Sequence, residues 1–536
     1  MLQRRSLISA SAAAIAAPQA KAQTMTDAPV AATRYGRVRG ATAEGVHSFK
    51  GIRYGASTAG ANRFRAPQPP APWGETRDAL AFAPMSPQPI ISLGGLFASW
   101  TFDKEMSEDC LGLNVWTRGL RDGAKRPVMV WFHGGDFSSL SGSRNVFDGT
   151  RLALRGDVVV VTVNHRLNAF GYAYLTEAAP KLAAAANPGM LDLVAALQWV
   201  RDNIAEFGGD AGNVTIFGQS GGGGKVSTIM AMPAAAGLFH RAIVQSGSYA
   251  RNAHLQAMSP AEGTRHARAL LAALEIPAGE AEKLAEIPVD ALVAGIAKAG
   301  RGADRPTWRP VADGTALPAG PWWPNPPAIS AEVPMMIGNT ATEMTMLIGG
   351  GDPASFTLDE AGLRQRLALR FKPEDAEKVL AHYRAARPSA TPSELFFTIA
   401  TANSFQKGSW TQAAQKASQH AAPVYLYELD WKTPVDGGKW QSPHSLELAL
   451  VFDNVAKSTS MVGTGPEPQR VADQMSAAWL AFARSGNPAT PALPWPAWQP
   501  ETNATMVFDV ESKVVNGFRD AERALYAGMS APGAFD

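Results

Sequence analysis

The fold of this chain follows from one segment, Gly209-Asp210-Ala211-Gly212-Asn213-Val214-Thr215-Ile216-Phe217-Gly218-Gln219-Ser220-Gly221-Gly222-Gly223-Gly224. Its branched and aromatic part, 214–217, predicts a short buried strand, and residues 225–232 predict a helix that ends at Pro233. Between them, Ser220 stands in a Gly-x-Ser-x-Gly turn, in which the glycines leave room for a sharp reversal of the chain. Such a turn lifts the serine hydroxyl clear beside a helix N-terminus, so Ser220 is a candidate nucleophile.

A glycine-rich turn between a strand and a helix can also hold the phosphates of a dinucleotide. That site needs an acidic residue at the end of the next strand, to bind the ribose. The next strand here, 241–245, is followed by Ser246, Gly247 and Ser248 and by no carboxylate. The phosphate alternative is therefore the weaker of the two.

Continuous apolar runs on either side of this segment are typical of strands buried on both faces. Strands alternate with apolar segments at helical spacing, which indicates an α/β fold with a doubly wound, mostly parallel sheet. The expected strands are 128–132, 158–163, 214–217, 241–245, 333–339 and 424–429, and a helix is expected over 191–204.

Two further features complete the expected architecture. Residues 35–49 predict a small N-terminal antiparallel hairpin. Alanine-rich helical segments at about 251–330 and 355–420 are expected as insertions at one edge or over the top of the sheet. No low-complexity linker separates them, so residues 23–536 are expected to form a single domain.

The first 22 residues have the order of a secretory signal peptide. Arg4-Arg5 precedes an apolar run, and Ala20-Lys21-Ala22 offers a small-x-small cleavage site. The paired arginines make export through the twin-arginine route plausible. A periplasmic or secreted protein is expected, the alternative being a cytosolic tail, and no later apolar segment is long enough to span a membrane.

Composition excludes several classes of protein. The formal net charge is only +2, from 49 basic and 47 acidic residues, and no basic run predicts a nucleic-acid partner. The one cysteine, Cys110, excludes a disulfide within the chain. Stability must therefore come from the apolar core.

A serine nucleophile needs a base, and the base needs an orienting acid. His444 is the favoured base, because it comes last in the chain and lies in a loop after the strand 424–429. Glu343, in the loop after 333–339, is the favoured acid, with Asp313 and Asp352 as competitors. The other histidines after Ser220 lie in contexts typical of surface positions or at the wrong edge of the sheet: His240, His254, His266, His382 and His420.

The reaction also needs amides that bind an oxyanion. The residue after the nucleophile, Gly221, offers one N–H, and the glycine-containing loop 133–137 offers others. His133 is expected to brace that loop. Glu447, one helical turn after His444, is expected to begin a helix or to support the site, because no second histidine stands at metal-binding spacing.

These motifs together resemble the type-B carboxylesterases, the family of para-nitrobenzyl esterases and cholinesterases. The resemblance covers nearly the whole chain after residue 22. The matching segments are Glu108-Asp109-Cys110-Leu111-Gly112-Leu113-Asn114-Val115, Asn164-His165-Arg166-Leu167, Gly189-Met190-Leu191-Asp192, Ala196-Leu197-Gln198-Trp199-Val200, Phe217-Gly218-Gln219-Ser220-Gly221-Gly222 and Arg309-Pro310-Val311-Ala312-Asp313-Gly314.

The resemblance implies an α/β-hydrolase fold and a role for each matching residue. Ser220 would be the nucleophile, Glu343 the triad acid and His444 the base. The oxyanion donors would be the amides of Gly135, Asp136 and Gly221. Asp313 would be structural, Ser246 would support the acid, and Arg63 with Glu108 and Arg166 with Asp192 would form structural salt bridges.

Three positions depart from the family pattern. Gln219 replaces a glutamate and Gly221 replaces an alanine, and Asp136 stands where glycine or alanine is common. A carboxylate beside an oxyanion is unfavourable, so the side chain of Asp136 must point away from it.

The sequence thus predicts a serine hydrolase that cleaves small-molecule carboxylic esters, with no metal or organic cofactor. Two alternatives stay open: the same triad acting on amides, lactones or carbamates, and a non-catalytic cholinesterase-like binding module. The sequence does not indicate the acyl group, the alcohol group or the oligomeric state.

Overall fold

The computed structural model describes residues 28–89, 94–102, 104–182, 186–249, 256–301, 305–527 and 529. The expected export signal, residues 1–22, lies outside the described residues. Over the ranges that are described, none of the helices combines the length and the apolar character needed to cross a bilayer.

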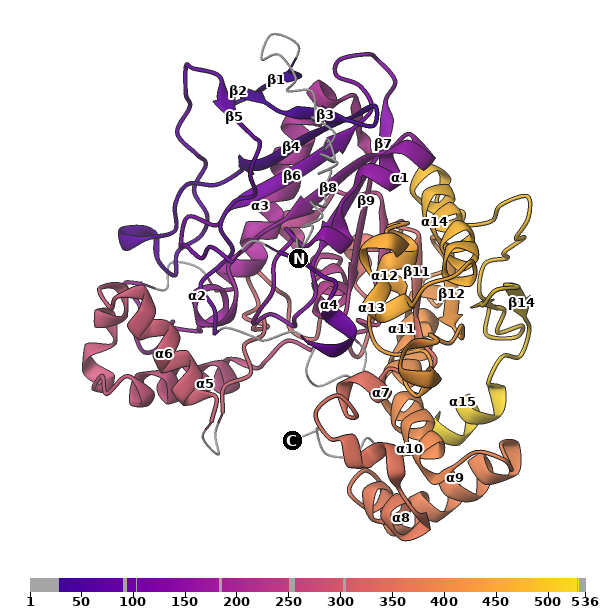
Figure 1. Cartoon of the computed structure of the whole chain (residues 1–536). Helices are drawn as coiled ribbons and strands as arrows, with labels where there is room; N and C mark the ends of the chain where they lie inside the picture. The colour runs from indigo at the N-terminus through magenta and orange to yellow at the C-terminus, as the bar shows by residue number, and fades with distance from the viewer. Residues whose placement is uncertain are drawn as a thin grey trace, which may run out of the picture.

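A large mixed sheet forms the centre of the molecule (Figure 1). Its strands from β13 to β8 run parallel, and antiparallel pairs occur only at its two ends. In spatial order the strands are β14 (Lys513–Val515), β13 (Thr505–Phe508), β12 (Val424–Leu429), β11 (Met335–Thr340), β10 (Arg241–Gln245), β9 (Gly209–Gln219), β7 (Arg126–Phe132), β8 (Val159–Val163), β6 (Gly112–Thr117), β4 (Val46–Arg53) and β3 (Ala41–Ala43). This is the mostly parallel sheet that the apolar runs predict.

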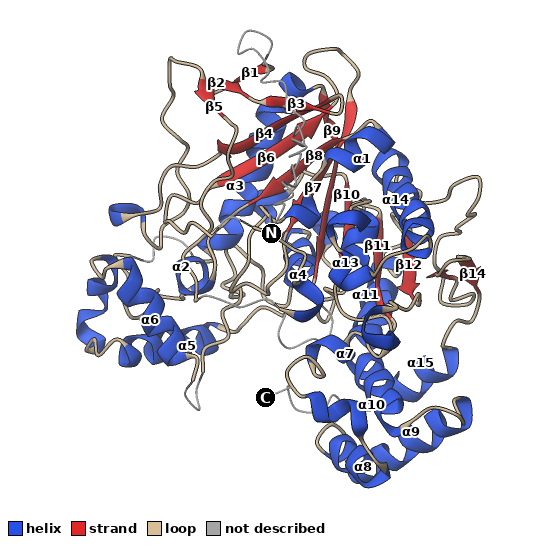
Figure 2. Cartoon of the chain, viewed as in Figure 1, coloured by secondary structure: helices blue, strands red, loops and turns tan. Residues whose placement is uncertain are grey.

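Helices cover both faces of the sheet (Figure 2). The helices are α1 (Thr150–Gly156), α2 (Asn168–Tyr172), α3 (Pro188–Asn203), α4 (Gly221–Ile229), α5 (Pro260–Ala273), α6 (Val289–Ala299), α7 (Met344–Leu347), α8 (Glu360–Ala368), α9 (Pro373–Ala386), α10 (Pro392–Thr401), α11 (Lys407–Ala417), α12 (Glu447–Val451), α13 (Thr459–Val462), α14 (Glu467–Ser485) and α15 (Asp520–Ala527). Helices α3, α4 and α11 pack on one face of the sheet, and α1, α12 and α14 pack on the other.

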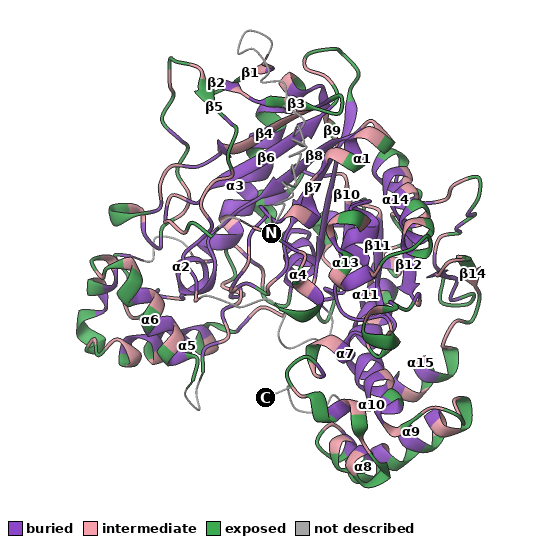
Figure 3. Cartoon of the chain, in the orientation of Figure 1, coloured by how far each residue is buried: buried purple, intermediate pink, exposed green. Residues whose placement is uncertain are grey.

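Alternate residues of each central strand enter two separate cores. In β7, Val130 and Phe132 pack in the core on the side of α3 and α4, whereas Met129 and Trp131 pack in the core on the side of α14. Strands β7, β8, β11 and β12 are buried along their whole length (Figure 3). Burial on both faces explains why these strands read as continuous apolar runs.

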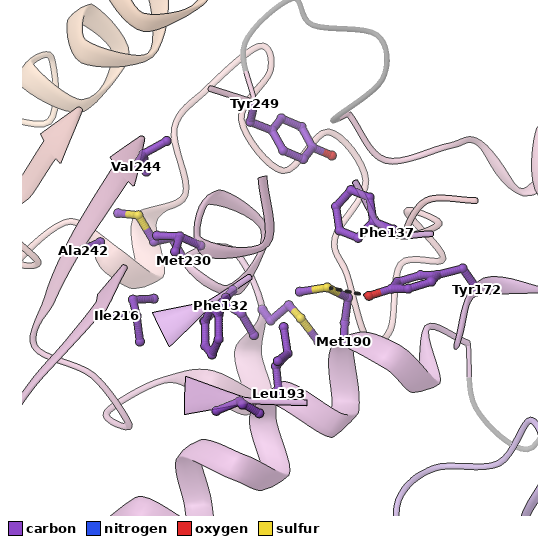
Figure 4. Close-up of a cluster of buried hydrophobic side chains, with 14 of the residues drawn as sticks. Phe132, Phe137, Tyr172, Met190, Leu193, Ile216, Met230, Ala242, Val244 and Tyr249 are labelled. Atoms are coloured by element: carbon purple, nitrogen blue, oxygen red, sulfur yellow. Dashed lines mark hydrogen bonds between the residues drawn. The ribbon is translucent and has the colours of Figure 1, made fainter. Parts of the chain in front are cut away.

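A close view of the first core shows how strand and helix side chains meet (Figure 4). Phe132 of β7 and Ile216 of β9 lie near Met190 and Leu193 of α3. Packing of this kind fixes the height of each strand relative to the helices, and with it the positions of the loops at the strand ends.

The N-terminal antiparallel strands form two hairpins, not the single hairpin predicted over 35–49. Strand β2 (Gly36–Arg39) pairs with β1 (Val30–Thr33), and both join β5 (Arg77–Asp78) in a small separate sheet. Strands β3 and β4 form the second hairpin. The turn between them has positive φ at Glu44 (52°) and Gly45 (76°), the geometry that favours a tight two-residue connection.

The two helical blocks differ in their relation to the sheet. The first contains α5 and α6, which pack on each other, and the described residues 305–327 that come after them form no helix or named strand. The second contains α8, α9 and α10, which also pack together, but its last helix, α11, packs against β11 and β12. In Figure 1 the α5–α6 block lies at the lower left and the α8–α10 block at the lower right.

Candidate active site

Ser220 occupies a strained turn between β9 and α4. Its backbone has φ 58° and ψ −127°, and its N–H donates to the carbonyl of Gln245 on β10 (2.8 Å). A side chain at Gly218 would lie 2.5 Å from the backbone of Gly222, so the turn admits only glycine there. The helix begins at Gly221 rather than at residue 225 as predicted, because four glycines give no helical signal but do allow the close approach.

Glu343 follows β11, as predicted for the acid, and it is wholly buried. Its Oε1 accepts hydrogen bonds from the Ser246 hydroxyl (2.6 Å) and from the Thr340 N–H (2.8 Å). These two donors fix one oxygen of the carboxylate. The other oxygen, Oε2, is left to face His444.

His444 contacts that second oxygen through Nδ1. Its ring is only 4 % exposed, and burial disfavours the charged imidazolium. The carboxylate of Glu343 opposes this effect by its charge and by its hydrogen bond, and the pKa of His444 is raised overall. The pair therefore has the geometry that a catalytic base needs, an imidazole whose ring orientation is set by a buried carboxylate.

Ser220 and His444 form no hydrogen bond with each other in the part of the chain that the structure describes. They are linked through Gln219, the residue before Ser220, which contacts the His444 ring. The side-chain amide of Gln219 lies 3.2 Å from His444 Nε2, the nitrogen that would accept a proton from Ser220. The Ser445 hydroxyl donates to the carbonyl oxygen of the same amide (3.3 Å). Gln219, which the sequence marked only as a departure from the family pattern, thus contacts the candidate base directly.

The competing acids have other partners. Asp313 accepts hydrogen bonds from the amides of Ala316 and Leu317 in its own loop. Asp352 forms an ion pair with Arg366. Of the competing histidines, His254 lies outside the described residues.

In the loop after β7, successive backbone carbonyls accept hydrogen bonds. The Gly134 carbonyl is 2.8 Å from His133 Nδ1, and the Gly135 carbonyl accepts the amides of Ser138 and Ser139. In a trans peptide the C=O and the following N–H point in opposite directions. The amides of Gly135 and Asp136 therefore point away from these bonds.

The same amides and that of Gly221 have no hydrogen-bond acceptor in the described part of the protein. Gly135 has φ 82°, and a side chain there would lie 2.4 Å from the Ser139 carbonyl. His133 is buried, which lowers its pKa well below the ordinary value and keeps the ring neutral. His133 thus braces the loop, in line with the prediction made from sequence.

A second carboxyl lies beneath the pair. Glu447 begins α12 and is wholly buried, and neither of its oxygens has a hydrogen-bond partner among the described residues. Burial, followed by the charge of Glu343, raises its pKa to about 8. Glu447 therefore favours its neutral form at pH 7, and it lies next to Glu343.

Another buried group beside the loop carries no signal in the sequence. Lys225, on α4, is wholly buried and donates hydrogen bonds into the loop after β7. A lysine in a predicted helix is normally read as a surface residue. Only the position of Lys225, directly after four glycines that bring α4 close to its neighbours, could have singled it out.

The two salt bridges implied by the resemblance are present. Arg63 pairs with Glu108 and Arg166 pairs with Asp192, all four side chains being at most 6 % exposed. Cys110 is a buried free thiol.

The comparisons with known proteins agree on one family. A model described as the carboxylesterase family matches residues 27–526. Para-nitrobenzyl esterase of Bacillus subtilis is 35 % identical, over 91 % of this chain and 96 % of its own length. Phenmedipham hydrolase of Pseudarthrobacter oxydans is 31 % identical, over 92 % and 97 %. The crystal structure of a carboxylesterase from Geobacillus stearothermophilus is similar with a TM-score of 0.80 and 37 % identity, covering 93 % of this chain and 99 % of that one.

Proposed function

This chain belongs to the carboxylesterase family and is a carboxylic ester hydrolase, and we propose that it acts through an acyl-enzyme on Ser220, with His444 as base and Glu343 as acid. The observation that supports this most directly is the buried contact between Glu343 and His444. It lies beside a serine whose backbone is held at positive φ. Strain of this kind is typical of a nucleophile on a strand-to-helix turn.

In the proposed reaction His444 Nε2 takes the proton of the Ser220 hydroxyl as its oxygen attacks the acyl carbon. Glu343 stabilises the imidazolium that forms. For this step the hydroxyl of Ser220 must replace the Gln219 amide at Nε2, a change that bound substrate can bring about because catalytic hydrogen bonds often tighten only in the complex.

The tetrahedral intermediate carries its negative charge on the former carbonyl oxygen. The amides of Gly135, Asp136 and Gly221 are the proposed donors to that oxygen. The alcohol then leaves with the proton from His444, and water hydrolyses the acyl-enzyme by the same steps in reverse. The carboxylate of Asp136 must point away from the oxyanion, because two negative charges repel each other.

The Ser220→Ala variant tests the nucleophile. Ester turnover should fall about 10⁶-fold, as when one member of such a triad is lost, while the melting temperature stays close to that of the unaltered protein. A fluorophosphonate probe should label the folded protein and fail to label the variant or heat-denatured protein. Near-normal turnover by Ser220→Ala would refute the assignment, and a folded, unlabelled wild-type chain would favour the non-catalytic module.

The preferred leaving group distinguishes ester hydrolysis from the hydrolysis of amides, lactones or carbamates. We propose a small uncharged ester as the substrate class, in keeping with the esterases to which the chain is similar. Rates measured on matched ester, amide, lactone and carbamate substrates with one common acyl group should be highest for the ester. A higher kcat/KM for any of the other three would replace this proposal.

Export is a further part of the proposal. We propose that residues 1–22 direct the protein to the periplasm or the exterior and that residues 23–536 act as one domain. N-terminal sequencing of protein from the periplasmic or culture fraction should begin near Gln23. Changing Arg4 and Arg5 to lysine should block export if the twin-arginine route is used and leave it unchanged if it is not.

A further inference from the structure

The loop that carries the proposed oxyanion donors rests on a buried cation. The Nζ of Lys225 donates hydrogen bonds to the carbonyls of His133 (2.9 Å) and Asp136 (2.6 Å), one at each end of that loop. The same ammonium lies 5.5 Å from the centre of the Phe137 ring. In the part of the chain that the structure describes it forms no ion pair, and the carboxylate whose charge acts on it is that of Asp136.

A buried ammonium without a counter-ion is costly to maintain. Burial lowers the pKa of Lys225 to about 7, and the charge of Asp136 opposes this shift. The two backbone carbonyls are thus the main compensation for removing the amine from water. A methionine or leucine would fill this volume at a lower cost, so the retained lysine points to a role beyond packing.

Lys225 is also the first residue of α4 with a side chain. A Cβ at Gly222 would lie 2.0 Å from the Phe132 carbonyl, and one at Gly221 would lie 2.2 Å from Asp136 Cα. The glycine turns therefore bring the helix into direct backbone contact with the loop. Lys225 joins the same two elements by hydrogen bonds, which fix the loop along its length.

The four successive carbonyls of the loop, those of residues 133–136, all accept hydrogen bonds. Lys225 holds those of His133 and Asp136, the His133 ring holds that of Gly134, and Ser138 and Ser139 hold that of Gly135. With the carbonyls fixed, the amides between them have one orientation. A preorganised donor needs no reorientation as charge develops, which is the condition for effective stabilisation of an oxyanion.

We propose that Lys225 is a positioning residue for the transition state, which locks the loop 133–137 onto α4 so that its amides and that of Gly221 converge on one point. This inference rests on the proposed function. Lys225 itself does not contact the reacting atoms. It acts through the backbone that it holds.

The Lys225→Met variant tests the proposal, since methionine fills a similar volume and donates no hydrogen bond. We expect kcat to fall about 10²-fold with little change in KM, the scale of a donor displaced by about 1 Å. The affinity for a trifluoromethyl ketone, which forms a tetrahedral adduct, should fall by the same factor. Lys225→Gln, which retains a donor, should recover part of both losses.

Lys416 supplies a matched control. It is also wholly buried, and its Nζ donates to the carbonyls of Ser330 and Ala331 and to Gln419, none of which belongs to the candidate site. Lys416→Met should lower the melting temperature and leave kcat and ketone affinity unchanged. Equal effects of the Lys225 and Lys416 variants on ketone affinity, or none at Lys225, would overturn the proposal.

Fluorophosphonate labelling keeps the two hypotheses apart. If the unaltered chain is not labelled at Ser220, the proposed function fails and the role of Lys225 fails with it. If Ser220 is labelled and Lys225→Met binds the ketone as tightly as the unaltered chain, only the role of Lys225 fails. Should Lys225→Met be insoluble, the Lys225→Gln variant gives the same comparison.

Discussion

At the scale of single residues, His444, the proposed base, is surrounded by groups that influence its protonation. Glu343 contacts Nδ1, the Gln219 amide lies near Nε2, and the neutral Glu447 lies beneath. A neutral amide beside Nε2 adds no charge to this set. The residue at position 219 therefore offers a direct means of changing the pKa of the base.

The Gln219→Glu variant should raise the pKa of His444 further, because a carboxylate within hydrogen-bonding distance favours the imidazolium. A base must be neutral to accept a proton, so activity is lost as the pH falls through this pKa. The acidic limb of the kcat/KM profile should therefore move about 1 pH unit or more toward alkaline pH. Gln219→Met, which removes the amide without adding charge, should show no such shift. An unmoved limb in Gln219→Glu would contradict the contact.

Glu447 should make stability depend on pH. Its pKa is raised to about 8 in the folded protein from an ordinary value of 4.5, so between these values the folded state holds a proton that the unfolded state has released. Stability contributed by this group therefore decreases as the pH rises from 4.5 to 8. Glu447→Gln removes the titration, and its melting temperature relative to the unaltered protein should be higher at pH 8 than at pH 5.

An exposed glutamate provides the comparison for that measurement. Glu501→Gln, at an exposed position, should give the same difference in melting temperature at both pH values. If Glu447→Gln behaves like Glu501→Gln, the carboxyl of Glu447 is charged in the folded protein. The hypothesis that Glu447 stays protonated next to Glu343 and His444 would then be wrong.

At the scale of elements, the contact between α4 and the loop after β7 depends on the absence of side chains. The family pattern has alanine at position 221, but here the Cβ of an alanine would lie 2.2 Å from Asp136 Cα and 2.3 Å from its carbonyl oxygen. Both are backbone atoms, so either the loop or the helix would have to shift. The close approach of Asp136 thus explains the glycine.

The Gly221→Ala variant should lower kcat about 10²-fold, because a displaced loop misplaces two of the proposed donors. Gly279 has no atom within 4 Å of the position of a Cβ, so Gly279→Ala is the control with the same chemical change and no clash. Steady-state kinetics on one ester would distinguish them. A wild-type kcat in Gly221→Ala would show that the loop tolerates the shift.

The elements that the sequence predicted well are those with a strong local pattern. The buried strands 241–245 and 424–429 occur with the predicted bounds, since continuous apolar runs are signals that burial alone produces. The start of α4 was missed by four residues because glycines disfavour a helix in isolation, and only the surrounding backbone makes the helix possible. The bonds of Lys225 were equally invisible, since they join residues about 90 positions apart.

The candidate triad was predictable for a different reason. The order serine, acid, histidine, with each residue after a strand, restricts the choice to loops at one edge of a parallel sheet. That reasoning selected Glu343 and His444, which the structure brings into contact. It could not reveal that Gln219 lies against the base, because side-chain direction in a tight turn is set by tertiary packing.

At the scale of the whole molecule, Arg63 joins three segments that are distant in the chain. Its guanidinium forms two hydrogen bonds with Glu108 and donates through Nη1 to the carbonyls of Leu284, Ala285 and Ile287. Those carbonyls belong to the connection between α5 and α6. One buried cation thus links the first helical block to Glu108, in the segment that leads into β6.

The Arg63→Met variant should both destabilise the protein and release this block. Removing one member of a buried, hydrogen-bonded ion pair leaves Glu108 charged and unpaired, at a cost of about 3–5 kcal/mol in the free energy of unfolding. Arg34→Met, which breaks the exposed pair with Asp202, should cost less than about 1 kcal/mol. Urea denaturation measures both values.

Limited proteolysis should cut Arg63→Met within 278–299 sooner than elsewhere, because the block loses its attachment before the sheet unfolds. Uniform cleavage along the chain would instead mean that the block and the sheet unfold as one cooperative unit.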